Sequence, residues 1–322
     1  MISVALCTYN GEQYIEEQLR SILDQTVPVN EIIICDDRST DRTTELIRGI
    51  IKKEKLADQI KLYVNETNLG VTKNFEKALS LCKGNYIFLS DQDDVWKKDK
   101  VEKTIVLFRQ KRKNLLVFSD AELVDSEGKK LGRSLWETTN PVLKKKYSVS
   151  DFTGARFITG ATVAIRKELL EYTLPIPECW IHDAWLAINA SLFGEIGYIE
   201  EKLIMYRQHQ NNVIGAKKRS IIEQVQYTKS NIIKSIRFRK TMDERFSSFY
   251  EMRANEMNLE EKKNIIRCIK FWEDSGSIIA RSKSKGVIII FGNLISGNYM
   301  RYNHGLLGAL VDFYIMFFKL PT

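Results

Sequence analysis

The chain has 322 residues, a formal net charge of +8, 44% hydrophobic residues and 28% charged residues. This composition is typical of a globular protein and excludes a disordered polymer, and the length suits one large domain or two smaller ones. No apolar run reaches the roughly 18 residues needed to cross a bilayer, and no basic segment precedes the first apolar one. Five scattered cysteines without a Cys-x-x-Cys pair favour a reducing, cytoplasmic location over a disulfide framework or a zinc site.

The positive charge is unevenly distributed along the chain. Residues 1–214 contain 30 basic and 31 acidic side chains, whereas residues 215–285 contain 17 basic and 9 acidic ones. A basic protein often binds nucleic acid, but here the excess is local. The sequence therefore predicts a nearly neutral domain over residues 1–214 and a basic, mostly helical region over residues 215–322.

Short apolar runs alternate with helix-like stretches along the first 125 residues. This alternation predicts an α/β domain with a mostly parallel sheet covered by helices. We expect strands at 3–8, 31–35, 60–64, 86–89 and 115–118, and helices at 12–25, 41–53, 71–82 and 97–109. Further on we expect an irregular excursion at 126–150, strands at 157–165 and 197–206, a helix at 182–193, and helices from about 216 onward. Because ligands bind at the carboxyl ends of parallel strands, the residues after each strand should form the site.

Two groups of carboxylates stand at such strand ends. Asp91, Asp93 and Asp94 follow the strand 86–89 directly. Their mutual repulsion would be relieved by Mg²⁺ or Mn²⁺ bridging a diphosphate, although Asp94 alone would also suit a helix N-terminus. Asp36 and Asp37 end the second strand, where one of them is expected to accept from a ligand such as the N–H of a pyrimidine base. A structural role for this pair is equally open.

The segments 4–11, 19–26 and 34–41 resemble the start of glycosyltransferase family 2, whose members are inverting enzymes of the GT-A fold. Asn68-Leu69-Gly70 with Asn74 is similar to the family's third sugar-nucleotide segment, and Asp91-Gln92-Asp93-Asp94 to its Asp-x-Asp metal motif. Arg38 stands where the family usually has Gly, which affects only the local turn. The resemblance covers about residues 1–214. It implies a GT-A domain with a Rossmann-like, mostly parallel sheet, followed by a C-terminal helical extension.

The resemblance also implies a nucleotide-sugar donor and a metal cofactor, Mg²⁺ or Mn²⁺. Asp93 and His209 would hold the metal, which would stabilise the negative charge on the leaving diphosphate. His209 lies in the segment 206–212, which closes over the diphosphate in similar sequences. The residues implied to bind the donor are Thr8, Tyr9, Asn10, Glu12, Asp36, Asp37, Asn68, Gly70, Asn74, Asp91, Gln92 and Arg207.

An inverting transfer needs one general base facing the acceptor hydroxyl. Asp183 stands where the family places an acidic base at a helix start, and capping of that helix is the structural alternative. His182-Asp183 replaces the Glu-Asp of most members and resembles a branch typified by bacterial rhamnosyltransferases. The residues expected around the acceptor are Gly160, Ala161, Trp180, His182 and Trp185. For the two tryptophans, packing in the core is equally open, and a strand bulge is the alternative for Gly160.

These features together predict a metal-dependent, inverting glycosyltransferase of bacterial surface-polysaccharide synthesis. The donor is expected to be dTDP-rhamnose or a UDP-hexose, and the acceptor a lipid-linked oligosaccharide. Two alternatives stay open. One is a haloacid-dehalogenase-type phosphatase with Asp91 as nucleophile and Asp93 as acid/base, and the other is a non-catalytic scaffold of the glycosyltransferase fold.

The basic C-terminal region has three alternative interpretations. Basic clusters at 217–219 and 237–240 would suit an anionic membrane at the inner face of the plasma membrane, a nucleic acid, or a solvated helix face. No nucleic-acid module is present, and we expect no nucleic-acid partner. The apolar tail would lie in the membrane interface, pack on the protein's own core, or join a homodimer. Its apolar residues are Leu306, Leu307, Leu310, Val311, Phe313, Tyr314, Met316, Phe317 and Phe318.

Overall fold

The computed structural model describes residues 1–153, 158–209, 232–303 and 305–317. The chain divides into two compact units. The first consists of residues 1–147 and 158–217, and the second of residues 148–157 and 218–322. Residues 210–212 and 217–219, together with Phe157 and Phe318 of the sequence analysis, lie outside the described residues.

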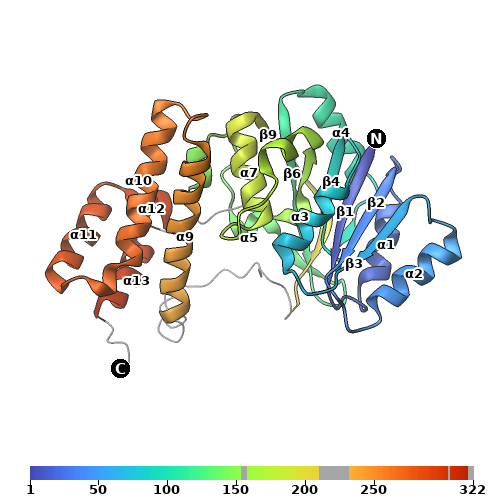
Figure 1. Ribbon diagram of the computed structural model, residues 1–322, viewed down its shortest axis with the longest axis horizontal. Helices are drawn as coiled ribbons and strands as arrows, with labels where there is room; N and C mark the ends of the chain where they lie inside the picture. Colours follow the sequence, from blue (N-terminus) through green and yellow to red (C-terminus); the bar gives the residue numbers. More distant parts are fainter. Residues whose placement is uncertain (154–157, 210–231, 304, 318–322) are drawn as a thin grey trace. The chain divides into compact units, whose positions relative to one another are not determined.

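The first half of the sheet is parallel, as expected from the strand–helix alternation. Its strands run in the spatial order β3, β2, β1, β4. Their bounds are β1 (Ile2–Thr8), β2 (Glu31–Asp36), β3 (Ile60–Val64) and β4 (Tyr86–Ser90). The register pairs Thr8 with Asp36 and Leu6 with Ser90. The carboxyl ends of β1, β2 and β4 therefore meet at one edge and bring their polar residues together (Figure 1).

The second half of the sheet is mixed, which the sequence does not predict. It continues in the order β8, β6, β9, β5, with β7 paired to β6. These strands are β5 (Val95–Trp96), β6 (Asn114–Val124), β7 (Lys130–Ser134), β8 (Ala164–Arg166) and β9 (Glu195–Arg207). β6 and β9 are parallel, whereas β8 is antiparallel to both β4 and β6. The expected strand at 157–165 is wrong in extent, because Gly160–Thr162 form a 3₁₀ turn, η2, before β8.

Helices cover both faces of the sheet. They are α1 (Ile15–Leu23), α2 (Thr43–Glu54), α3 (Val71–Leu81), α4 (Lys100–Gln110), α5 (Leu135–Thr139), α6 (Leu170–Thr173) and α7 (His182–Phe193), with a 3₁₀ turn η3 (Lys167–Leu169) before α6. Val4, Leu6 and Ile34 share one buried core with α1, α2 and α4. Because side chains alternate across a strand, α3, which contacts β1 and β2, and α7, which contacts α3, cover the opposite face. The fold is thus a GT-A-like, helix-covered sheet, as predicted.

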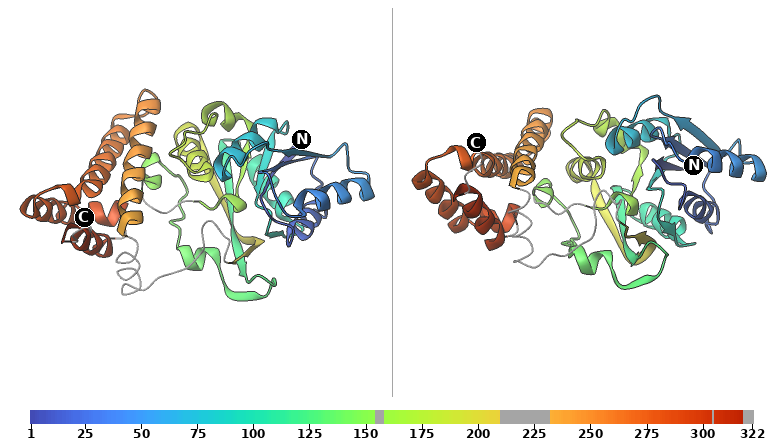
Figure 2. Two further views of the ribbon diagram at one scale, coloured as in Figure 1. Left: turned by 60° about the horizontal axis from the view of Figure 1, so that its bottom comes forward. Right: turned by 90° about the horizontal axis from the view of Figure 1, so that it is seen from below.

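The second unit is helical, also as predicted. It comprises η1 (Val149–Phe152), α9 (Ile232–Arg253), α10 (Leu259–Gly276), η4 (Ile278–Ala280), α11 (Lys283–Ile295), α12 (Asn298–Tyr302) and α13 (Leu306–Phe317). α9 and α10 run side by side (Figure 2). A buried ion pair joins Arg239 to Asp312 at 2.6 Å, and the hydroxyls of Ser275 and Tyr299 also donate to Asp312. None of the helices described is long and apolar enough to span a bilayer.

Candidate active site

The loop between β4 and β5 carries the Asp-Gln-Asp-Asp segment at the edge where the parallel strands end. Gln92 fastens this loop to the end of β1: its amide accepts from the Tyr9 N–H at 2.8 Å and donates to the Tyr9 carbonyl at 2.9 Å. Asp94 is buried and accepts from the Arg207 N–H at 3.0 Å, so its carboxylate ties the end of β9 to the same loop. Three strand ends thereby converge on the acidic segment.

Asp93 and His209 lie together, as the resemblance implies. A ring nitrogen of His209, Nε2, is 2.7 Å from Asp93 Oδ2, and the imidazole stacks on Tyr14 with ring centroids 5.3 Å apart. Arg207 holds the surrounding backbone by donating to the Asp93 carbonyl and to Glu17. The Asp93 carboxylate is a ligand that suits Mg²⁺ or Mn²⁺, and the His209 nitrogen beside it would be the second protein ligand. No group of three or more His, Cys, Asp or Glu side chains able to hold a metal occurs in the described part of the chain, so a metal here would take its other ligands from substrate or water.

Asp183 opens α7 beside η2. Its Oδ2 accepts from the Gly160 N–H at 3.1 Å, and its Oδ1 from the N–H of the next residue, Ala184, at 2.7 Å. A Cβ on Gly160 would lie 2.9 Å from His182 Nε2. The close approach at Gly160 is therefore to the start of α7, and this explains the glycine without a substrate.

The imidazole of His182 is buried. It stacks on Phe75 with ring centroids 4.1 Å apart, and its Nδ1 has no hydrogen-bond partner among the described residues. Burial lowers its pKa, and the charge of Asp183 offsets only part of the shift. A contact between His182 and the acceptor stays a prediction.

The pKa values of two carboxyl groups in the acidic loop between β4 and β5 are strongly raised. Burial, with the charges of Asp93 and Asp183, raises the pKa of Asp91 to about 7. Burial and the charges of Asp93 and Asp91 raise the pKa of Asp94 well above its usual range. Such shifts cluster at functional sites, where burial and like charges are brought together. The dependence of the Asp91 pKa on Asp183 also indicates that the acidic loop and the start of α7 belong to one site.

Lys100 is a site residue that the sequence analysis missed. It is buried, and its ammonium donates to the carbonyl of Ala161 at 2.9 Å and lies 4.4 Å from the centre of the Trp96 ring. Burial lowers its pKa to about 7, although the charges of Asp94 and Asp91 oppose the shift. The lysine thus links the acidic loop to η2. One feature of the sequence indicates this role. A cation at the first position of α4 interacts unfavourably with the helix dipole, so a lysine there indicates a contact outside the helix.

Asp36 and Asp37 organise the loops at the ends of β2 and β3. Asp36 accepts from Ser39 and from the Thr8 hydroxyl, the latter at 2.7 Å, and Asp37 accepts from the N–H groups of Leu69 and Gly70 and from Asn65. Both carboxylates are buried, and all four oxygens have a partner within the chain. Both carboxylates therefore have the structural role that the sequence left open. A carboxylate oxygen can accept a second bond, so the predicted role in donor binding stays open.

The other residues implied to bind the donor divide into buried and rim positions. Asn74 is buried and donates to the Cys35 carbonyl, so it joins α3 to β2. Tyr9 lies at the rim and is half exposed. The other rim residues hold neighbouring loops by hydrogen bonds. Asn10 accepts from the Thr40 N–H, Glu12 accepts from the Arg42 N–H, and Asn68 donates to the Asp37 carbonyl. Gly70 has a φ of 80° where α3 begins, a conformation that other residues rarely adopt.

The predicted acceptor contacts of Trp180 and Trp185 need correction. Their side chains are 1% and 0% exposed, and the Trp185 indole donates to the Thr173 carbonyl at 2.8 Å. Neither ring offers a face to a sugar, because both pack in the core, with ring centroids 5.3 Å apart. Ala161 is also buried, and its carbonyl is the acceptor for Lys100.

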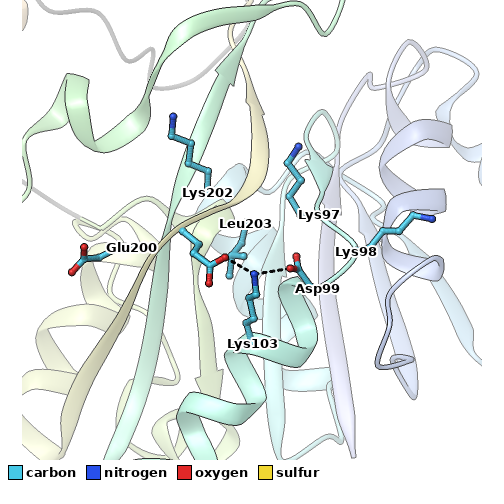
Figure 3. Close-up of a pocket in the computed structure, with 8 residues that line it drawn as sticks. Lys97, Lys98, Asp99, Lys103, Glu200, Lys202 and Leu203 are labelled. Carbon is cyan, nitrogen blue, oxygen red and sulfur yellow. Dashed lines mark hydrogen bonds and ion pairs between the residues drawn. The ribbon is translucent and has the colours of Figure 1, made fainter.

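A surface pocket lies at the start of α4 (Figure 3). Lys97, Lys98, Lys103 and Lys202 line it, and the Lys103 ammonium pairs with Asp99 at 2.6 Å and with Glu201. None of the predicted catalytic, metal or donor residues lines this pocket. Lys98 pairs with Asp24 at 3.0 Å and Lys202 with Glu122 at 3.7 Å, both outside the pocket. The pocket carries no functional conclusion.

The sequence resemblance is confirmed by comparison with known families. The family model "Glycosyl transferase family 2" matches residues 3–174. The chain belongs to glycosyltransferase family 2. It is 29% identical over 307 residues to the dTDP-rhamnosyl transferase RfbG of Shigella flexneri, covering 88% of this chain and 97% of that protein. It is 36% identical over 133 residues to TuaG of Bacillus subtilis, described as a putative teichuronic acid biosynthesis glycosyltransferase, covering 41% of this chain and 51% of TuaG.

Solved structures agree with the family on the fold. A Staphylococcus aureus TarS structure in complex with UDP-GlcNAc superimposes with a TM-score of 0.57 at 17% identity, covering 98% of this chain and 90% of that one. The mannosyltransferase PcManGT of Pyrobaculum calidifontis, in complex with GDP-Man and Mn²⁺, gives a TM-score of 0.54 at 15% identity over 98% and 86% of the two chains. The family 2 protein is therefore a glycosyltransferase. Family membership decides against the phosphatase and the non-catalytic scaffold.

Proposed function

We propose that this glycosyltransferase moves a sugar, with inversion, from a nucleotide-diphosphate donor to a saccharide acceptor of bacterial surface-polysaccharide synthesis. A dTDP-rhamnosyl transferase matches the chain over 97% of its own length, and this supports dTDP-rhamnose as the donor. UDP-hexoses are the second donor class, since a structural neighbour holds UDP-GlcNAc. The acceptor is proposed to be a lipid-linked oligosaccharide, and the site of action the cytoplasm.

The observation that carries the proposal is the position of Asp183 across from the acidic loop. Its carboxylate is held by the Gly160 N–H at 3.1 Å, and its charge contributes to the raised pKa of Asp91. In the proposed reaction Asp183 takes the proton of the acceptor hydroxyl, whose oxygen attacks the anomeric carbon. The bond from that carbon to the diphosphate breaks, and its electron pair leaves with the nucleoside diphosphate. A single base on the acceptor side is what inversion requires.

The donor would lie along the edge where β1, β2 and β4 end. Tyr9 and the loop residues Asn10 and Asn68 surround that edge, and Gln92 fixes the backbone between them. Asp93 and His209 would hold Mg²⁺ or Mn²⁺, which when bound neutralises charge on the leaving diphosphate. Arg207 has its guanidinium bound to Glu17 and to backbone carbonyls, so it is proposed to position His209 and the acidic loop and not to contact phosphate.

The test is the variant Asp183→Asn in the full chain, assayed with dTDP-rhamnose and UDP-hexoses. A lost general base should lower turnover by about 10²–10⁴-fold, while titration of the nucleoside diphosphate should give unchanged affinity. Asp58→Asn, an exposed acid on a loop of the first unit, is the matched control and should keep full turnover. Turnover by Asp183→Asn at the level of this control would refute the assignment of the base. A product with the donor's anomeric configuration would refute inversion.

A further inference from the structure

Helices α11 to α13 carry an apolar surface that the core of the second unit does not cover. On α11, Ile288, Phe291 and Ile295 are exposed to 70%, 54% and 86%. Their spacing of three and four residues places them on one stripe of the helix. On α13 a second stripe is exposed, formed by Leu306, Leu310, Phe313 and Phe317. We define these seven residues, together with Met300 of α12, which is 79% exposed, as the α11–α13 surface.

The two stripes lie on neighbouring helices. A Cβ on Gly286 of α11 would meet Met316 of α13, and the Lys283 ammonium lies 5.2 Å from the centre of the Phe317 ring. The opposite stripe of α13 is buried and includes Val311, Ile315 and Met316. Part of the apolar tail therefore does pack on the protein's own core, and the other part is left exposed. A helix that is apolar all round needs a second apolar environment for its free face.

The charged side chains near the α11–α13 surface indicate which environment covers it. Within the described residues of 281–317, the basic side chains are Arg281, Lys283, Lys285 and Arg301, and the acid is Asp312. Asp312 is fully buried in its pair with Arg239, so no carboxylate of this segment reaches its surface. Lys283 and Lys285 lie at the start of α11, where a cation opposes the helix dipole, and Arg281 pairs with Asp274. Within residues 281–317, the charged side chains beside this apolar surface are thus all basic.

We propose that the α11–α13 surface binds an anionic lipid bilayer and lies in its interface. Exposed Leu, Ile and Phe side chains with basic residues beside them are the composition of an interfacial helix, whose apolar face enters the boundary of the acyl chains while its cations meet anionic headgroups. A second copy of the chain fits less well. It would bring the same lysines and arginine against one another without a carboxylate from either copy of this segment. The inference does not depend on the proposed reaction.

The test is flotation of the full chain with vesicles, without donor or acceptor, so that failure of the proposed function cannot affect the result. Vesicles of phosphatidylcholine containing phosphatidylglycerol should bind the protein, and vesicles of phosphatidylcholine alone should bind it weakly. Ile288→Ser with Ile295→Ser should lower the bound fraction about tenfold or more. Lys283→Gln with Lys285→Gln keeps the apolar face and should remove most of the preference for phosphatidylglycerol.

The matched control is Leu259→Ser with Ile266→Ser on α10. These residues are 76% and 49% exposed in the same unit, but Leu259 is followed by Glu260 and Glu261, so their loss should leave flotation unchanged. Flotation of Ile288→Ser with Ile295→Ser at the wild-type level would overturn the proposal. So would a wild-type chain that does not float but forms a dimer in light scattering that the same pair of substitutions dissociates.

Discussion

The environment of Lys100 leads to a quantitative prediction for Lys100→Met. Methionine keeps most of the lysine's volume and leaves no large cavity. It removes the donor to the Ala161 carbonyl, which is 2.9 Å away, and a hydrogen bond contributes about 0.5–1.5 kcal/mol. It also removes an amine whose pKa of about 7 lets it share protons with Asp91 and Asp94, and loss of one partner from a buried pair of this kind costs about 3–5 kcal/mol. We expect the free energy of unfolding to fall by about 3 kcal/mol at pH 8, or about 6–12 °C in melting temperature for a unit of this size.

The loss of stability in Lys100→Met should grow as the pH rises. The pKa of Asp91 is already raised to about 7 with Lys100 present, and without the ammonium both Asp91 and Asp94 must bind protons more tightly. The folded variant then retains more carboxyl protons than the folded wild type as the pH rises. Its stability therefore falls more steeply with increasing pH. The difference between the two proteins should be small at about pH 5.5 and largest at about pH 8.

Thermal melts of both proteins at the two pH values test this reasoning, with Lys103→Met as the control. Lys103 lies one turn further along α4, its side chain is 34% exposed, and it pairs with Asp99 and Glu201. Such a partly exposed pair contributes about 1 kcal/mol or less. If Lys100→Met melts no lower than Lys103→Met, or if its deficit does not shrink on acidification, then Lys100 does not balance the buried carboxylates.

Two further predictions concern the base and the metal. In Gly160→Ala the new Cβ would lie 2.9 Å from His182 Nε2, which is too close, so the start of α7 should shift and move Asp183 with it. The kcat should fall by roughly 10²-fold with unchanged nucleotide affinity. An unchanged kcat would show that the contact at Gly160 does not position the base. His209→Ala removes the nitrogen 2.7 Å from Asp93, and the Mn²⁺ concentration for half-maximal activity should rise about tenfold or more. An unaltered Mn²⁺ dependence would exclude His209 as a ligand.

The parts of the fold that the sequence predicts best are those set by residues close together in the chain. β1 to β4 and α7 occur where apolar runs and helical periodicity place them. Burial on both faces leaves a continuous apolar run in β1, β2 and β4. β5 and β8 have two and three residues, which is too short for any periodicity. The antiparallel pairing of β8 with β4 and β6 follows from chain direction in space, which composition does not encode.

Sequence by itself determined the family, the parallel half of the sheet and the order of the motifs at its edge, since these follow from local pattern. Tertiary structure alone decided which of the singled-out residues are accessible. Trp185 is fully buried, Lys100 lies among carboxylates, and only one stripe of α13 is exposed. Burial and charge environment are set by contacts between residues far apart in the chain. Counting charges along the sequence therefore locates the basic region that gives the +8 net charge. It does not show on which surface the cations lie beside exposed apolar side chains.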